Sequence, residues 1–271
     1  MSTNARTFTE SNSHWYYPDG RPCYELPKKD GKGTKSPTLA DARKLDLLPS
    51  VTKIISMLDK PALNDWKVEQ ACLAILTSTQ NQGEELDAFV HRILHEERVQ
   101  DEQAKIARDL GSRIHDAIDN AIGMRDWDRT LEAYVNPVLQ WVMETGKVVW
   151  TEKHLAGNGY GGRGDILLNN ESLTALVLAD FKTTSKLPDK ESWLEHRLQT
   201  SAYAATLFSS QRTLTVTGNV YISTKNPGEI KAFTQDDWAD TYVNGFCPLM
   251  NHWHWAHKYC PITAEKNGHK A

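Results

Sequence analysis

The spacing of apolar residues changes close to residue 146. Before that point apolar residues recur every three or four positions, which is the spacing of one buried face of an α-helix. The clearest stripe runs from Ile106 to Ala121. Helices are predicted over residues 61–75, 84–97, 102–122 and 130–144. The first half of the chain is therefore predicted to be mainly helical, with one more short helix directly after Pro49.

Residues 147–183 contain short runs typical of β-strands instead. Short strands are predicted over residues 148–153, 164–168 and 176–181, separated by turn sequences such as Gly157-Asn158-Gly159. Three consecutive strands of this kind form a meander. A helix over 192–209, strands over 213–223 and 230–233, and a last helix over 235–257 are predicted to follow. This order of elements predicts an α/β protein with an αβββαβ core.

The pattern also divides the chain into four parts. Residues 1–48 are rich in turn formers and are predicted to be an irregular or short-hairpin segment that Trp15, Tyr16 and Tyr17 anchor. The other parts are a helical subdomain at 49–100, the αβββαβ core at 101–233, and a C-terminal helix and tail at 234–271.

Composition narrows the class of protein. The chain has 271 residues, of which 39% are hydrophobic and 24% charged, which excludes collagen-like, coiled-coil and wholly disordered proteins. Four scattered cysteines are too few for a disulfide framework, and no apolar run reaches the length of a signal peptide or a membrane span. A soluble cytoplasmic protein without a membrane partner is expected. The formal net charge of −4 argues mildly against a polyanionic partner.

Two aspartates stand at the ends of adjacent predicted strands. Asp165 begins the second strand of the meander, and Asp180-Phe181-Lys182 ends the third. Since side chains alternate along a strand, Asp180 and Lys182 share one face while Phe181 points to the other. Two converging carboxylates make a hard-oxygen site that suits Mg²⁺ or Mn²⁺, and a lysine beside them could neutralise a phosphate. The alternative is a solvated surface ion pair, which is common for Asp-x-Lys on a strand.

Glycines come directly before the first of these aspartates. Gly161, Gly162 and Gly164 weaken a strand, so they predict that another backbone or a ligand approaches closely there.

The residues around these aspartates carry a family resemblance. Gly111-x-x-x-His115 on a helix precedes Asp165, and Asp180-Phe181-Lys182-Thr183 and Gln199-x-x-x-Tyr203 follow it. In order and spacing the sequence resembles the PD-(D/E)XK nuclease superfamily, in particular the RecB-like exonuclease branch with its phage exonucleases and the mitochondrial genome maintenance exonuclease. Pro49-Ser50-Val51-Thr52 resembles the opening of those members. Gly164 stands where the name-giving proline would be.

The resemblance implies a restriction-endonuclease-like fold, in which helices flank a mixed central sheet and a helical subdomain precedes it. It also implies roles for individual residues. The metal ligands would be His115, Asp165, Asp180 and the backbone carbonyl of Phe181, with Lys182 as catalytic lysine. Gln199 and Tyr203 would be further catalytic residues, lying against the active site or the DNA backbone.

Further candidates come from their positions beside these motifs. Glu152 opens the meander and is a candidate third carboxylate acting through water. Candidate DNA contacts are Ser50, Thr52, Arg163, Thr183, Thr184 and Ser185, because hydroxyls, amides and arginine make most contacts to nucleic-acid backbones.

The predicted function is a DNA exonuclease that depends on Mg²⁺ or Mn²⁺ and acts in recombination, repair or phage DNA processing. Linear single- or double-stranded DNA is the expected partner, together with a recombination protein. The sequence leaves polarity and oligomeric state open. The alternatives are a structure- or sequence-specific endonuclease, an inactive nuclease-fold DNA-binding module, and a structural protein with a chance motif match.

Charge is unevenly distributed in a way that fits this function. Residues 1–67 hold 11 Lys+Arg and 8 Asp+Glu, a net charge of +3. A basic entrance for DNA is predicted at Lys28, Lys29, Lys32, Lys35, Lys53 and Lys60.

Overall fold

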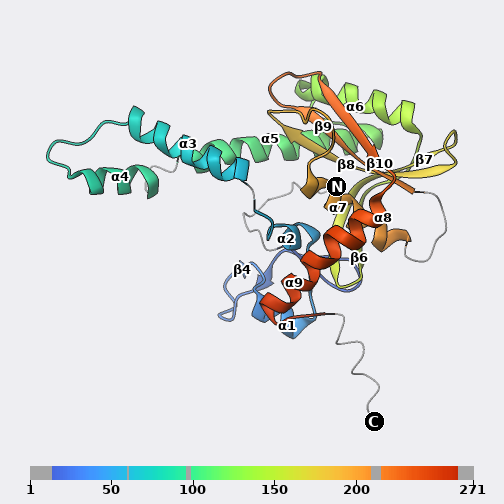
Figure 1. Ribbon diagram of the computed structural model, residues 1–271, viewed down its shortest axis with the longest axis horizontal. Coiled ribbons are helices and arrows are strands. Elements are labelled where there is room, and N and C mark those ends of the chain that lie inside the picture. The colour runs from blue at the N-terminus through green and yellow to red at the C-terminus, as the bar shows by residue number, and fades with distance from the viewer. Residues whose placement is uncertain (1–13, 60, 96–98, 209–214, 262–271) are drawn as a thin grey trace, which may run out of the picture. The chain divides into compact units, whose positions relative to one another are not determined.

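The computed structural model describes residues 14–59, 61–95, 99–208 and 215–261 (Figure 1). The chain forms two compact units, one from Met1–Met57 with Asn136–Ala271 and one from Leu58–Val135. They are called unit 1 and unit 2 and are described separately. The predicted division of the chain into four parts, after residues 48, 100 and 233, stays a prediction. Two compact units do not show which segments can fold on their own.

A five-stranded mixed sheet is the centre of unit 1 (Figure 1). Its strands are β6 (Lys147–Gly157), β7 (Tyr160–Asn170), β8 (Ala175–Thr184), β9 (Thr215–Ser223) and β10 (Ile230–Gln235). The spatial order is β10-β9-β8-β7-β6, and only the β8–β9 pair is parallel. The predicted meander is therefore confirmed as β6, β7 and β8.

Helices cover the two faces of the central strand β8. Parallel neighbours need a crossover connection, and α7 (Leu194–Phe208) supplies it between β8 and β9 while packing on β6, β7, β8 and β9. On the other face, Trp141 of α6 (Glu132–Thr145) meets Phe181 edge to face, with ring centroids 6.4 Å apart. Since Phe181 points to α6, its neighbours Asp180 and Lys182 point to the α7 face.

The N-terminal segment of unit 1 contains short paired strands, and β3 and β4 form a short hairpin of the kind predicted. It comprises β1 (Trp15–Tyr16), β2 (Pro22–Cys23), β3 (Leu26–Pro27), β4 (Thr34–Lys35), α1 (Leu39–Leu45), β5 (Leu48–Pro49) and α2 (Val51–Ile55). Trp15 is fully buried against Trp253 and Tyr259, and Tyr16 is 4% exposed. The predicted anchoring of this segment is confirmed for Trp15 and Tyr16.

The predicted last helix is divided into three parts. α8 (Trp238–Asp240) continues into a π-helical turn at Thr241–Phe246 and then into α9 (Cys247–His257). Pro248 has no N–H to donate, and its ring clashes with the carbonyl four residues earlier in a regular α-helix. A wider π turn just before the proline accommodates both defects, so the pattern of apolar residues predicted the helix but not its internal change of pitch.

Unit 2 is helical, as predicted. It contains α3 (Pro61–Thr77), α4 (Leu86–His95), α5 (Val99–Ile122) and a 3₁₀ turn (Arg129–Leu131), and α3 contacts both α4 and α5. Ile114, Ala117 and Ile118 of α5 are buried, as the stripe predicted, but Ile106 at its start is 63% exposed. Within the described residues, no helix combines the length and the apolar character needed to cross a membrane.

The central strand gives a first test of this fold. Leu178→Ala is expected to lower the free energy of unfolding by about 2 to 5 kcal/mol, because Leu178 is 1% exposed and its removal leaves a cavity in β8. Leu173→Ala is the matched control, since Leu173 is 56% exposed in the β7–β8 turn and should change stability by less than about 0.5 kcal/mol. Urea denaturation measures both. Equal losses would contradict the placement of Leu178 in the core.

Candidate metal centre

Strands β7 and β8 part at the predicted site. Their pairing runs from Asn170 opposite Ala175 to Ile166 opposite Ala179, and the next residues are Asp165 and Asp180. Beyond that point the backbone N–H of Phe181 donates to Oδ2 of Asp165 at 2.7 Å. The carboxylate thus serves as the acceptor that a backbone carbonyl of β7 would provide if the two strands stayed paired. The same hydrogen bond fixes Asp165 beside Asp180.

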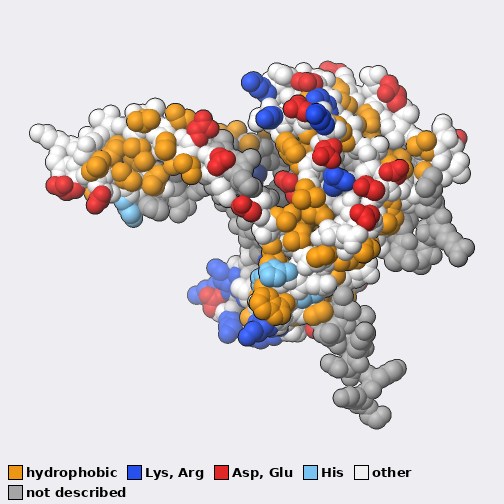
Figure 2. Space-filling model, in the orientation of Figure 1, with side chains coloured by type: hydrophobic (Ala, Val, Ile, Leu, Met, Phe, Trp, Pro, Cys, Tyr) orange, Lys and Arg blue, Asp and Glu red, His pale blue; other side chains and the backbone are white. Residues whose placement is uncertain are grey.

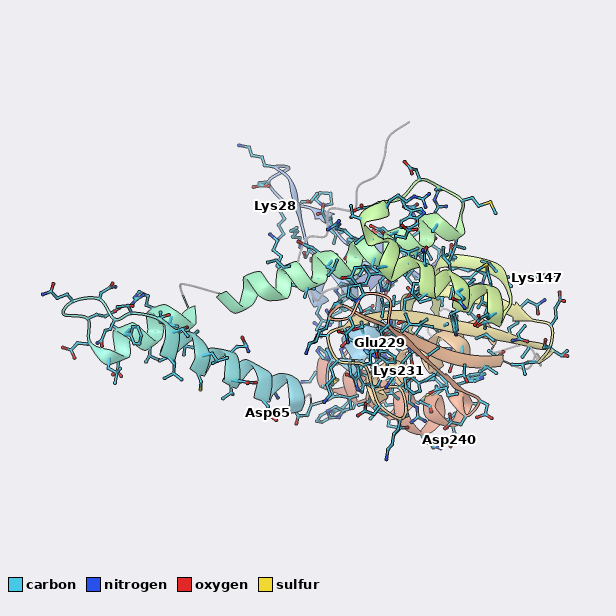
Figure 3. The ribbon with its side chains drawn as sticks, turned by 90° about the horizontal axis from the view of Figure 1, so that it is seen from above. Lys28, Asp65, Lys147, Glu229, Lys231 and Asp240 are labelled. Carbon is cyan, nitrogen blue, oxygen red and sulfur yellow. The ribbon has the colours of Figure 1, made fainter. Side chains whose placement is uncertain are left out.

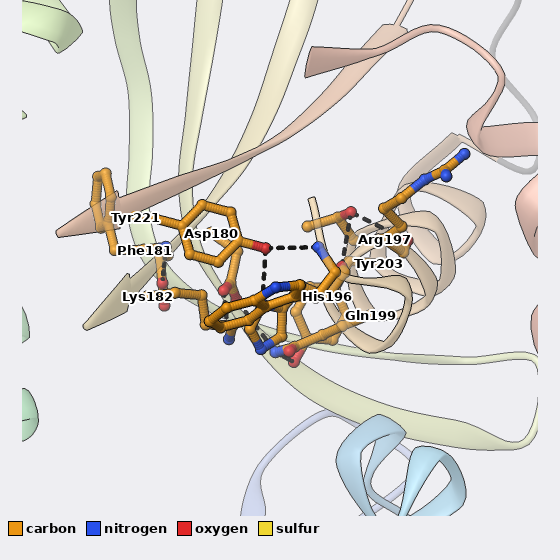
Figure 4. Close-up of polar contacts among 11 residues, drawn as sticks. Asp180, Phe181, Lys182, His196, Arg197, Gln199, Tyr203 and Tyr221 are labelled. Carbon is orange, nitrogen blue, oxygen red and sulfur yellow. Dashed lines mark hydrogen bonds and ion pairs between the residues drawn. The ribbon is translucent and has the colours of Figure 1, made fainter. Parts of the chain in front are cut away.

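Asp180 is buried and has partners on two sides. It is 2% exposed, and its Oδ2 lies 2.5 Å from the ammonium of Lys182 (Figure 4). Its Oδ1 accepts a hydrogen bond from Nε2 of Gln199 at 3.1 Å, and the same nitrogen donates to the hydroxyl of Tyr203 at 3.0 Å. Since burying an unpaired charge is costly, the lysine and the amide explain how this carboxylate is tolerated.

The two α7 residues of the predicted motif therefore lie against Asp180. Gln199 and Tyr203 are four residues apart and share one helical face. Burial, helped by the negative charge of Asp180, raises the pKa of Tyr203 well above its usual value.

Aromatic rings explain two of the three glycines before Asp165. A Cβ at Gly162 would overlap the Tyr203 ring, and one at Gly164 would lie 3.0 Å from the ring of Trp150. At Gly161 both a backbone and a side chain lie close. The backbone of Ser50 forms a parallel β-bridge with Gly161, and a Cβ at Gly161 would lie 2.6 Å from the Tyr16 side chain. The groups that approach these glycines closely are thus mainly side chains of the same protein. Another backbone segment comes close at Gly161.

Glu152 has an unusual backbone for a strand residue. Its φ is +50°, in the left-handed region that few non-glycine residues occupy, and it lies between the regular pairs of Thr151 and Lys153. A carboxylate oxygen of Glu152 and one of Asp165 lie within 4.8 Å of each other. Glu152 also forms an ion pair with Arg163, whose Nε is 2.7 Å from Oε2. Backbone strain of this kind clusters at functional sites.

These donors fit a divalent metal ion. Glu152, Asp165 and Asp180 lie on three adjacent strands. Oxygens of Glu152 and Asp165 lie within 4.8 Å of each other, and Asp180 comes directly after the last β7–β8 pair. Hard oxygen ligands are what Mg²⁺ and Mn²⁺ take. Arg163 pairs with Glu152, and Lys182 pairs with Asp180. Burial lowers the pKa of Arg163, but the Glu152 and Asp165 carboxylates outweigh it, and the net effect is a raised pKa.

The candidate DNA contacts of the sequence differ in accessibility. Ser50 is 3% exposed, and its hydroxyl accepts the N–H of Lys53 as the cap of α2, whereas Thr52 is exposed. Thr183, Thr184 and Ser185 lie at the end of β8, directly after Lys182. The Thr184 hydroxyl donates to the carbonyl of Lys186 at 2.9 Å, so it is engaged within the protein.

Basic side chains gather over β4 and α1 in unit 1 (Figure 2). Lys28 lies on the projecting β3–β4 hairpin, and Lys29 and Lys32 are exposed beside it (Figure 3). The other predicted entrance residues are less available. Lys35 pairs with Asp41 at 2.5 Å, the ammonium of Lys53 lies 4.5 Å from the centre of the Trp15 ring, and Lys60 lies outside the described residues.

His115 belongs to the other compact unit. It is partly buried on α5, one turn after the buried Gly111. Its predicted role as a metal ligand stays a prediction of the resemblance.

Sequence reasoning missed a group of residues next to Lys182. The hydroxyl of Tyr221 on β9 lies 2.9 Å from Nδ1 of His196 and accepts the backbone N–H of Trp193 at 3.0 Å. Burial, with Asp180 nearby, raises the pKa of Tyr221 to about 12. One signal was available, since His196 precedes Gln199 by three residues and so shares its helical face.

Comparison with known proteins assigns the family. The sequence profile of the PD-(D/E)XK nuclease superfamily matches residues 71–254, which is more than half of the chain and includes the carboxylates and the lysine described above. The chain belongs to the PD-(D/E)XK nuclease superfamily. The five-stranded mixed sheet flanked by helices is thus the restriction-endonuclease-like fold that the sequence predicted.

Membership of this superfamily makes the protein one of the metal-dependent nucleases, which are hydrolases acting on nucleic acid. No curated protein matches the sequence. Among solved structures, the crystal structure of SSO0001 is similar at 16% identity over 74% of this chain and 95% of that chain, with a TM-score of 0.30. A superposition of that quality does not establish a shared fold, so the assignment rests on the family profile.

The hydrogen bond between Asp165 and Phe181 can be tested separately from metal binding. Asp165→Ala is expected to lower the free energy of unfolding of the metal-free protein by about 1 to 3 kcal/mol, since the buried N–H of Phe181 loses its acceptor. Asp165→Asn keeps an acceptor oxygen in place and should lose less than the alanine variant. Urea denaturation in EDTA compares the two. Equal stability of the two variants would show that this hydrogen bond does not support the fold.

Proposed function

We propose that this protein is a divalent-metal-dependent DNA exonuclease of the RecB-like branch. The observation that supports the proposal most is the convergence of Asp165, Asp180 and Lys182 where β7 and β8 part. The order of motifs from His115 to Tyr203 resembles enzymes of that branch that act at DNA ends. Recombination, repair or phage DNA processing is the proposed setting.

The proposed metal ligands come from the carboxylate group. Asp165, Asp180 and the backbone carbonyl of Phe181 hold one or two ions, with Glu152 acting through water and His115 included on the resemblance. A bound Mg²⁺ or Mn²⁺ supplies Lewis-acid activation of the attacking water and stabilises negative charge on the phosphate.

Residues beside the ligands have two different tasks. The Lys182 ammonium holds the attacking water and offsets the charge that develops on the phosphate as the P–O bond breaks. Gln199 and Tyr203 are positioning residues, since their hydrogen bonds orient Asp180 rather than touch the substrate. Arg163, which pairs with Glu152, would contact a phosphate if Glu152 were engaged through water by a bound ion.

Hydroxyls and lysines extend the substrate path in this proposal. Thr183 and Ser185 follow the catalytic lysine at the end of β8 and bind phosphate oxygens of linear DNA. Thr52 and the exposed lysines of the β3–β4 hairpin add contacts that carry no sequence information.

A cleavage assay tests the proposal. End-labelled linear DNA, single- or double-stranded, should be degraded from its ends with Mg²⁺ or Mn²⁺, while covalently closed circular DNA should stay intact. Asp180→Asn and Lys182→Met are expected to lower the rate at least about 100-fold, because each removes charge stabilisation at the reacting phosphate. Asp236→Asn and Lys225→Met, both at exposed positions, are the matched controls and should cleave like wild type.

Two outcomes would contradict it. Internal cleavage of circular DNA would make the enzyme an endonuclease. Absence of cleavage of every DNA by the wild-type protein would leave a nuclease-fold binding module.

Metal binding gives a readout that does not depend on activity. Calorimetric titration with Mn²⁺ should show affinity reduced at least about 10-fold in Asp180→Asn and in His115→Ala. His91→Ala is the control for the histidine, because His91 is exposed on α4 in the same unit. If His115→Ala binds Mn²⁺ as tightly as His91→Ala, His115 is not a ligand.

A further inference from the structure

The loop that joins β8 to α7, residues 185–193, leaves the sheet directly after the catalytic lysine's strand. Lys186 and Lys190 are exposed on it, and it ends on Trp193, which is 36% exposed. Asp189 and Glu191 lie beside these lysines and pair with Lys231 and Arg197, respectively. Proteins bind single-stranded nucleic acid through basic side chains that meet phosphates and aromatic rings on which bases stack.

Trp193 is held by a small aromatic cluster. Its ring centroid lies 5.2 Å from that of Tyr221 and 5.5 Å from that of His196. Its backbone N–H donates to the Tyr221 hydroxyl, which also contacts Nδ1 of His196 (Figure 4). Tyr221 is fully buried, so the cluster has a fixed base while the indole keeps an exposed surface.

The cluster adjoins the catalytic lysine. Tyr221 is the parallel-strand partner of Lys182, as Asn219 is of Asp180. Neighbouring strands lie about 4.8 Å apart, and partners in register point to the same face of the sheet. The side chains of Lys182 and Tyr221 therefore lie side by side, and Trp193 packs on the second of them.

The loop is tied to β10 in two places, which fixes the indole before any substrate arrives. The ammonium of Lys231, labelled on β10 in Figure 3, donates to the carbonyl of Pro188 at 3.1 Å. The guanidinium of Arg197 donates to the Glu191 carboxylate at 3.0 Å. The same group donates to the side-chain oxygen of Gln235, at the end of β10, at 2.9 Å. A binding surface that is already ordered loses less entropy when a ligand binds.

We propose that Trp193 stacks on an unpaired base of the DNA strand being cut, next to the scissile phosphate, and that Lys186 and Lys190 contact phosphates of the same strand. This inference rests on the proposed nuclease function, and it identifies an unpaired strand as the form of substrate that the site takes.

An abasic scan tests it. Fluorescence anisotropy in EDTA, where cleavage is prevented, measures binding of labelled single-stranded oligonucleotides that carry one abasic nucleotide at successive positions from the end. For the wild-type protein, one position should weaken binding roughly 5- to 150-fold, which is the range for loss of one stacked base.

Substitutions of Trp193 test whether the loss of binding affinity at the abasic position comes from stacking on its indole ring. Trp193→Leu keeps apolar volume without a ring, so it should weaken binding of the intact oligonucleotide and remove the effect of the abasic position. Trp193→Phe should retain both affinity and the abasic effect. Trp255→Leu is the matched control, because Trp255 is an exposed tryptophan that also packs beside a histidine, His252, on α9.

The outcomes separate this inference from the proposed function. An abasic profile that is the same in Trp193→Leu and wild type, or absence of oligonucleotide binding, overturns the stacking role. Cleavage is scored in a separate assay with Mn²⁺, so a wild-type protein that binds with the expected profile but cuts nothing would contradict the nuclease proposal and support the stacking surface.

Discussion

One hydrogen bond, from the backbone N–H of Phe181 to the carboxylate of Asp165, lies where two strands of the central sheet part. A buried N–H without an acceptor is costly, so β8 could not leave β7 at this point unless something replaced the strand partner. The replacement is itself one of the proposed metal ligands. Since β8 keeps its pairing with β9 through Thr184, the strand stays in place while its other edge opens. The opening of the sheet and the position of Asp165 are thus one feature.

Charge compensation at the site follows from this opening. Three carboxylates, Glu152, Asp165 and Asp180, face two cations, Arg163 and Lys182, so the group carries a formal charge of −1 without metal. Each cation lies within ion-pair distance of one carboxylate, which limits the cost of burying these charges. A divalent ion would reverse the sign of the group and free the cations for the phosphate. The acidic balance of the chain is therefore compatible with a nucleic-acid substrate.

Features set by local periodicity could be predicted from the sequence. The helices follow from three- to four-residue spacings and the meander from short runs typical of β-strands, and the shared face of Asp180 and Lys182 follows from alternation along β8. Other features depend on contacts between distant residues. The left-handed backbone of Glu152 could not be predicted, because no glycine stands at that position. Trp193 meets Tyr221 only because β8 and β9 pair in parallel. The roles of Gln199 and His115 come from resemblance, since neither residue type alone distinguishes a functional group from an ordinary boundary residue.

The parallel pairing of β8 and β9 also determines where this chain can change in length. The crossover through residues 185–193 and α7 carries Trp193, His196 and Gln199, so inserting or deleting a residue in that loop would rotate or shift three side chains that lie near Lys182 and Asp180. The turn between β7 and β8 lies five residues from Asp180, roughly 16 Å along the strand. Added residues there would leave the site intact. Variation in loop length among related sequences should therefore accumulate at that turn and be almost absent from the crossover.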